Sequence, residues 1–141
     1  MGRALALDIG TKRTGAAITD DLNITAQGVG VHATTGYKSE LAWVRKLMEK
    51  YEIDTIIIGH PVNMNGSKGK RAIACESIAR KLERDVKTKV ILWDERLTTV
   101  EAKETLIKTG ASRKKRKKIV DQVAAQLILS SWLADDKASG P

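Results

Sequence analysis

The sequence predicts an α/β domain built on a mixed five-stranded sheet, with helices on both faces. Two features of the chain support this prediction. Strand-like segments separated by short turns occupy residues 1–32, which favours three antiparallel strands. Helix-like and strand-like segments then alternate before the chain ends in two helices. Right-handed crossovers would place the two later strands parallel to the first one.

Size and composition indicate one domain. The chain has 141 residues, and we expect a single domain at residues 1–136 followed by a disordered tail at 137–141. Hydrophobic residues make up 42% of the chain, and no apolar run reaches the ~18 residues that a membrane span needs. The N-terminus shows no export leader, and one cysteine, Cys75, excludes an intrachain disulfide. We therefore expect a cytoplasmic protein with no membrane contact.

The first three strands are expected at residues 3–9, 14–19 and 24–32. Residues 10–13 form the short turn of a hairpin, and residues 20–23 form the next turn-rich break. This arrangement explains the antiparallel part of the predicted sheet.

The middle of the chain alternates helices with short buried strands. Apolar residues recur at helical spacing from Leu41 to Tyr51, with Ser39 as a candidate cap. The segments DTIIIG at 54–59 and VILWDE at 90–95 are apolar runs of the length expected for fully buried strands. Ile78, Leu82 and Val86 mark the apolar stripe of a helix between them.

Two helices are expected after the last strand. A capping box at Thr98–Glu101 opens the first of them, and Gly110 ends it. Residues 119–136 then form a helix that is apolar enough to lie against the sheet.

Acidic residues stand where the predicted parallel strands end. Asp8 follows an apolar run, Asp94 and Glu95 follow the strand that begins at residue 90, and Asp121 lies near the start of the last helix. Each acid also has a plainer interpretation. Asp8 suits a turn, Asp94 and Glu95 suit a helix cap, and Asp121 suits the positive end of a helix dipole.

Electrostatics favours a metal site if these acids converge. Two carboxylates about 4 Å apart repel by ~4 kcal/mol at an effective dielectric constant of 20, so such a cluster needs a cation between its members. Oxygen ligands without a Cys or His cluster favour Mg²⁺ or Mn²⁺. Such ions, held by acids beside a basic patch, are typical of phosphodiester cleavage.

A basic run at residues 113–118 explains most of the formal net charge of +8, because its sequence is RKKRKK. A cluster of this kind suits a nucleic-acid backbone, although a solvated charged surface is the plainer interpretation. The position of the run next to Asp121 favours nucleic-acid binding by its six members: Arg113, Lys114, Lys115, Arg116, Lys117 and Lys118.

Four motifs, in order along nearly the whole chain, resemble those of the YqgF family. They are DIGTKRTGAA at 8–17, GHPVNMNGS at 59–67, DERLTTVEA at 94–102 and VDQVAAQLIL at 120–129. This family contains pre-16S rRNA nucleases, also described as Holliday-junction-resolvase-like proteins, of the ribonuclease H-like superfamily. The resemblance implies a ribonuclease H-like fold, in agreement with the predicted order of elements.

The resemblance also implies roles for individual residues. It places the acidic triad on Asp8, Glu95 and Asp121, which would bind the metal and carry the catalysis, and it selects Glu95 over Asp94. The residues it implies as contacts of the nucleic-acid backbone are Lys12, Arg13, Asn63, Asn65, Ser67 and Arg96. The chain departs from the family pattern at His60, where an apolar residue is usual, and at Asn65, where Asp is common.

The implied activity is metal-dependent endonuclease action on structured RNA in 5′ end maturation of pre-16S rRNA. Related proteins have been assigned to four-way DNA junctions, so a Holliday junction resolvase acting on branched DNA is an alternative. A non-catalytic nucleic-acid-binding module is another alternative, although the chain keeps all three acids. An ATPase, suggested by the DIGTKRTG segment alone, is disfavoured. The nucleotide clamp of such ATPases needs two domains of this kind, whereas 141 residues supply one, and no GxxxxGK[ST] loop is present. The expected oligomeric state is a monomer or a weak homodimer.

Overall fold

The computed structural model describes residues 2–97 and 113–139. In chain order, the elements are β1 (Arg3–Ile9), β2 (Arg13–Thr19), β3 (Ala26–Ala33), α1 (Tyr37–Lys50), β4 (Ile53–His60), α2 (Lys70–Val86), β5 (Lys89–Asp94), the short 3-10 helix η1 (Glu95–Leu97) and α4 (Arg113–Ser139). The sheet order is β3-β2-β1-β4-β5, with antiparallel pairing from β3 to β1 and parallel pairing from β1 to β5. The predicted mixed sheet is confirmed.

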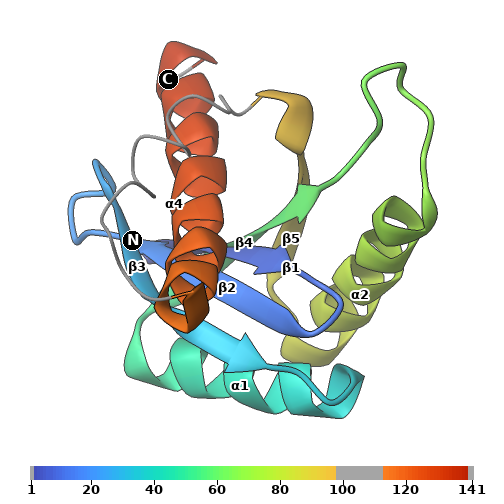
Figure 1. The fold of residues 1–141 in the computed structure, drawn as a ribbon. Coiled ribbons are helices and arrows are strands. Elements are labelled where there is room, and N and C mark those ends of the chain that lie inside the picture. Colours follow the sequence, from blue (N-terminus) through green and yellow to red (C-terminus); the bar gives the residue numbers. More distant parts are fainter. Residues whose placement is uncertain (1, 98–112, 140–141) are drawn as a thin grey trace.

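The central strand β1 is apolar because both of its faces are covered (Figure 1). Leu5 and Leu7 belong to the core beneath α1 and α2. Ala4 and Ala6, which point to the opposite face, belong to a second core beneath α4. The α4 side of the sheet therefore carries small side chains, which allow a helix to approach closely.

Helix α4 begins earlier and ends later than the sequence predicts. The basic run forms its first turns, because Lys and Arg are good helix formers and extend the helix upstream of the apolar segment. Asp121 consequently lies well inside the helix, so the interpretation of it as a helix-start acid is wrong. The helix continues to Ser139, past the expected start of a disordered tail at residue 137.

The beginning of α1 also differs from the prediction. Gly36 is the N-cap residue, and Ser39 lies inside the helix. The Ser39 hydroxyl instead contacts Nε2 of His32 at 2.7 Å, joining α1 to β3. The helix expected between residues 98 and 110 lies outside the described residues.

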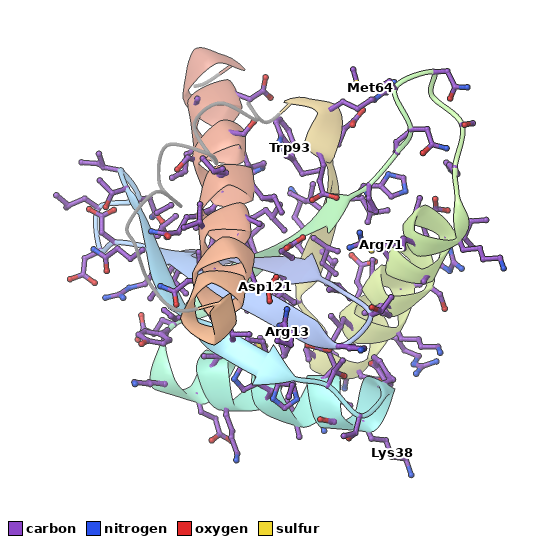
Figure 2. The ribbon with its side chains drawn as sticks, in the orientation of Figure 1. Arg13, Lys38, Met64, Arg71, Trp93 and Asp121 are labelled. Atoms are coloured by element: carbon purple, nitrogen blue, oxygen red, sulfur yellow. The ribbon has the colours of Figure 1, made fainter. Side chains whose placement is uncertain are left out.

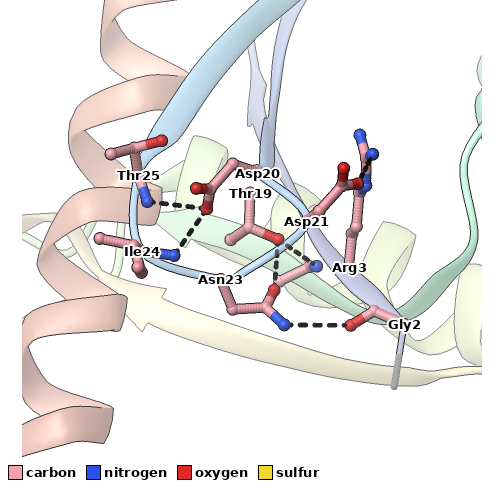
Figure 3. A network of polar contacts seen from close by, with 9 residues as sticks. Gly2, Arg3, Thr19, Asp20, Asp21, Asn23, Ile24 and Thr25 are labelled. Carbon is pink, nitrogen blue, oxygen red and sulfur yellow. Dashed lines mark hydrogen bonds and ion pairs between the residues drawn. The ribbon is translucent and has the colours of Figure 1, made fainter.

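The turn between β2 and β3 lies beside the start of β1 (Figure 3). Oδ1 of Asp20 accepts the backbone N–H groups of Ile24 and Thr25 at 2.6 and 3.0 Å. The Thr19 hydroxyl donates to Oδ1 of Asn23 at 2.6 Å. These bonds fix the short connection that keeps the strands in register.

None of the helices in the described part of the chain has the length and apolar character needed to cross a membrane.

The packing of α4 on the sheet predicts a large cost for a cavity beneath it. Ile57 is fully buried in the α4 core, so Ile57→Ala should lower the free energy of unfolding by about 2–5 kcal/mol, measured by urea denaturation. Ile73 is 56% exposed, and Ile73→Ala should change stability far less. Equal losses in the two variants would contradict the described core.

Candidate active site

The carboxyl ends of β1, β4 and β5 meet at one edge of the sheet, because these three strands run parallel. Asp8 lies near the end of β1, and Glu95 opens η1 directly after β5. The neighbours of Asp8 on β1, Leu7 and Ile9, belong to the core under α1 and α2, so strand alternation directs Asp8 toward α4. Asp8 therefore faces the helix that carries Asp121.

Gly15 of β2 allows α4 to lie directly on the sheet beside Asp8. Gly15 and Asp8 are register partners in the β1–β2 ladder. A Cβ atom added to Gly15 would lie 2.0 Å from the backbone oxygen of Asp121, so no side chain fits there. Asp121 therefore lies over β2, next to the position of Asp8 on β1.

Gly59 of β4 provides space on the other side of Asp8. Leu7 pairs with Ile58 in the β1–β4 ladder, and Asp8 and Gly59 each follow that pair on their strands. A Cβ atom added to Gly59 would lie 3.2 Å from Cδ of Glu95, so the Glu95 side chain packs against this glycine. The three predicted acids thus come to one region on the α4 side of the sheet.

Two of these acids act electrostatically on the thiol of Cys75. Cys75 is buried in the core under α1 and α2. Burial raises its pKa to about 11, with further upward contributions from the charges of Glu95 and Asp8 and an opposing one from Arg71. Asp8, Glu95 and Arg71 therefore all lie within electrostatic reach of one thiol.

Arg13 forms an ion pair with Asp121 (Figure 2). Its Nε donates to Oδ2 of Asp121 over 2.7 Å, and the two side chains are 34% and 21% exposed. The guanidinium lowers the cost of placing the Asp121 carboxylate near that of Asp8. Arg13, expected to contact nucleic acid, thus contacts a member of the predicted triad.

The donor chemistry of the three carboxylates fits a hard divalent cation such as Mg²⁺ or Mn²⁺. Among the described residues, no three His, Cys, Asp or Glu side chains form a group that could hold a metal ion. The carboxylate of Asp121 is instead engaged by Arg13. The acids converge on one region, but they are not arranged as a closed set of ligands.

Asp94 and Arg96 form a closed pair at the start of η1. Oδ2 of Asp94 accepts from Nη2 of Arg96 at 2.6 Å, and Oδ1 accepts the backbone N–H of Arg96 at 2.9 Å. The side-chain hydrogen bond from Arg96 is the main cause that holds the pKa of Asp94 below its usual value. Asp94 therefore caps this turn, whereas Glu95 packs against Gly59. Asp94 and Glu95, between which the residue pattern alone did not choose, thus have different surroundings.

The loop between β4 and α2 is held by its own side chains. Nδ2 of Asn63 donates to the Ser67 hydroxyl over 2.9 Å, and Oδ1 of Asn65 accepts from the backbone N–H of Ser67 at 3.0 Å. Gly66 adopts a φ of 88°, which favours glycine. The loop residues expected to contact nucleic acid thus bond to one another, and Met64 is left 85% exposed (Figure 2).

A family model described as RuvX, Holliday junction resolvase, matches residues 2–135. The chain belongs to the RuvX family. A protein of Geobacillus sp. strain WCH70, named pre-16S rRNA nuclease, is 46% identical over 133 residues, which are 93% of this chain and 96% of the relative. A protein of the same name from Carboxydothermus hydrogenoformans is 44% identical over 131 residues, 93% of this chain and 95% of the relative. These matches confirm the resemblance predicted from the four motifs.

Two solved structures share the fold of this RuvX-family chain. RuvC of Thermus thermophilus superposes with a TM-score of 0.58 at 10% identity and covers 94% of this chain and 96% of its own. The Fowlpox virus resolvase in complex with Holliday junction DNA gives a TM-score of 0.54 at 15% identity, with 94% and 97% covered. At these identities the likeness supports the fold alone, and it confirms the ribonuclease H-like architecture.

Arg71 is a basic residue of this candidate site that the sequence analysis missed. It lies in the first turn of α2, and its Nη2 donates to the backbone oxygen of Ile9 over 3.2 Å. Its position in the sequence could have indicated this role, because Arg71 comes just after the loop that follows β4. The predicted topology brings that loop to the end of β1. Lys12 and Arg13 line the same pocket as Arg71.

His60 has a protein partner at the end of β4. Its Nε2 lies 2.8 Å from Oε2 of Glu76, and Nζ of Lys68 lies 3.2 Å from the same oxygen. Hydrogen bonds from His60 and then Lys68 hold the pKa of Glu76 below its usual value. This contact gives His60 a structural role that joins β4 to α2.

The side chains of the basic run lie outside the described part of the structure, although its backbone begins α4. Their binding to nucleic acid stays a prediction for Arg113, Lys114, Lys115, Arg116, Lys117 and Lys118.

The close approach of Gly15 to α4 predicts a specific steric effect. Gly15→Ala should push the backbone of Asp121 off the sheet and lower the free energy of unfolding by about 1–3 kcal/mol or more, measured by thermal or urea unfolding. Gly28→Ala is the matched control, because the new methyl group would meet the side chain of Gln122, which can rotate away. A loss of stability in Gly15→Ala no larger than that in Gly28→Ala would contradict the close approach.

Proposed function

We propose that this chain is an endonuclease that cleaves structured nucleic acid with the help of Mg²⁺ or Mn²⁺, in 5′ end maturation of pre-16S rRNA. The observation that supports this most strongly is the position of Asp8, between Asp121 over Gly15 and Glu95 over Gly59. The relatives named pre-16S rRNA nuclease, which match nearly the whole chain, favour precursor rRNA as the substrate.

Asp8, Glu95 and Asp121 would hold the metal. A bound Mg²⁺ or Mn²⁺ supplies Lewis-acid chemistry, which activates water and stabilises charge on the leaving oxygen. The carboxylates keep the site negative and open toward the sheet edge, while nearby guanidinium groups offer donors to a phosphate. Arg13 is the nearest such group, because it already contacts Asp121.

Recognition of the substrate would depend on its backbone and shape. The described cations near the acids are Lys12, Arg13, Arg71 and Arg96. Guanidinium and ammonium groups bind phosphates without reading the base sequence. We place the protein in the cytoplasm, where its single cysteine stays reduced, as a monomer or a weak homodimer.

A Holliday junction resolvase is the second candidate, supported by the description of the matching family model. The two candidates differ in substrate and not in chemistry. A side-by-side cleavage assay on precursor rRNA, a synthetic four-way DNA junction and plain duplexes distinguishes them. Preference for the precursor supports maturation, preference for the junction supports resolution, and no cleavage of either overturns the nuclease proposal.

The role given to Asp8 predicts separate effects on cleavage and binding. Asp8→Asn should abolish Mn²⁺-dependent cleavage, because the amide removes the negative charge that attracts the metal. Nucleic-acid binding, measured by fluorescence anisotropy, should be largely retained. Asp54→Asn is a control on an exposed acid near the opposite end of the sheet. Equal cleavage by Asp8→Asn and the parent would indicate a contaminating nuclease or a binding module.

The role given to the basic run predicts a change in salt dependence. Replacement of Lys114, Lys115, Arg116 and Lys117 by Ala should weaken binding to all sequences alike. The slope of log K against log salt should fall by about 0.9 for each phosphate that the variant no longer neutralises. An unchanged slope would mean that these side chains face only solvent.

A further inference from the structure

A pocket lies between the β1–β2 turn and the start of α2. It has a volume of about 260 Å³ and is lined by Gly10, Thr11, Lys12, Arg13, Arg71 and Asp121. Figure 2 shows Arg13, Arg71 and Asp121 approaching this region from three different elements. Of the three predicted acids, Asp121 alone lines this pocket, and most of the lining comes from the β1–β2 turn.

The charges on the wall of this pocket favour an anion. Lys12, Arg13 and Arg71 contribute three cations, whereas the single carboxylate, that of Asp121, is already engaged by Arg13 at 2.7 Å. A ligand with negative charge would meet donors on more than one side. Neutral or cationic ligands would gain little from the same wall.

Arg71 is held in a position suited to binding a phosphate. One of its terminal nitrogens is anchored to the backbone oxygen of Ile9, at the end of β1. A guanidinium has five N–H donors, so this one hydrogen bond leaves others able to form the paired hydrogen bonds that phosphates accept. Because Ile9 directly follows Asp8 on β1, this hydrogen bond also brings the Arg71 side chain to the strand end that carries Asp8.

The start of α2 adds to the positive potential. Gly69 is its N-cap residue and provides no side-chain hydrogen bond to the first backbone N–H groups. The first turn contains no acidic residue, so the helix dipole there is not offset by a carboxylate of its own. This feature supports the charged side chains and does not define the pocket alone.

We propose that this pocket binds a phosphate group of the nucleic-acid substrate next to the linkage that is cleaved, with Arg71 as its fixed anchor. The inference rests on the proposed nuclease function and names a binding residue for the same site. Arg71 fixes the position of the nucleic-acid strand, because its guanidinium is hydrogen-bonded to the backbone of β1, which carries Asp8. Lys12 and Arg13 line the same pocket from the turn and complete the set of donors.

The test measures binding in an Asp8→Asn background, so that cleavage does not interfere. Arg71→Gln removes the charge but keeps an N–H donor for the Ile9 carbonyl, which limits damage to the fold. The slope of log K against log salt for a four-way junction should fall by about one. Arg80→Ala, an exposed arginine on the same helix, is the control and should change the slope less.

A second measurement locates the phosphate. Neutral methylphosphonate linkages are introduced one at a time into the junction, and one position should weaken binding by the parent severalfold. Arg71→Gln should be insensitive at that position and normal at the others. Thermal unfolding confirms that both variants are folded.

Three results would count against the inference in different ways. An unchanged salt slope together with an unchanged methylphosphonate profile in Arg71→Gln would overturn it and leave the nuclease proposal intact. Loss of sensitivity at every position alike would also overturn it, because it would indicate a general structural effect. Failure of the parent to bind any nucleic acid would overturn both proposals.

Discussion

The close approach of α4 to the sheet is the constraint on which the site depends. Small residues on that face, with Gly15 at the closest point, let the helix backbone lie against β2. A helix at the usual distance from a sheet of larger side chains would hold Asp121 too far from Asp8. Packing and function therefore use the same feature. The alanines of the second core also determine how closely Asp121 approaches the sheet.

Charge balance is the second requirement of this arrangement. Three carboxylates near one sheet edge repel one another, and desolvation near a core makes that repulsion stronger. In the described structure, guanidinium groups offset part of it, with Arg13 paired to Asp121 and Arg71 bonded to the Ile9 carbonyl next to Asp8. The same cations attract phosphates. A polyanionic substrate can thus reach an acidic site that would otherwise repel it.

The strands and their order could be predicted from the sequence because alternating and continuous apolar runs report burial directly. The acids could be located because each one ends or interrupts such a run. The start of α4 could not be found this way, since a run of Lys and Arg has no apolar period and helix propensity alone decided its structure. Arg71 was missed because its importance comes from the Ile9 carbonyl, which lies far away in sequence. The choice between Asp94 and Glu95 needed the family resemblance, because strand alternation alone does not decide which of these two consecutive acids faces the site.

The position of Cys75 has a consequence for the chemical durability of the protein. Oxidants and alkylating agents attack the thiolate, and a thiol with a raised pKa and little exposure offers almost none at neutral pH. The only sulfhydryl of the chain is therefore shielded, although it sits just beneath the acids. Peroxide stress that inactivates many thiol-bearing enzymes would leave this thiol largely unreacted.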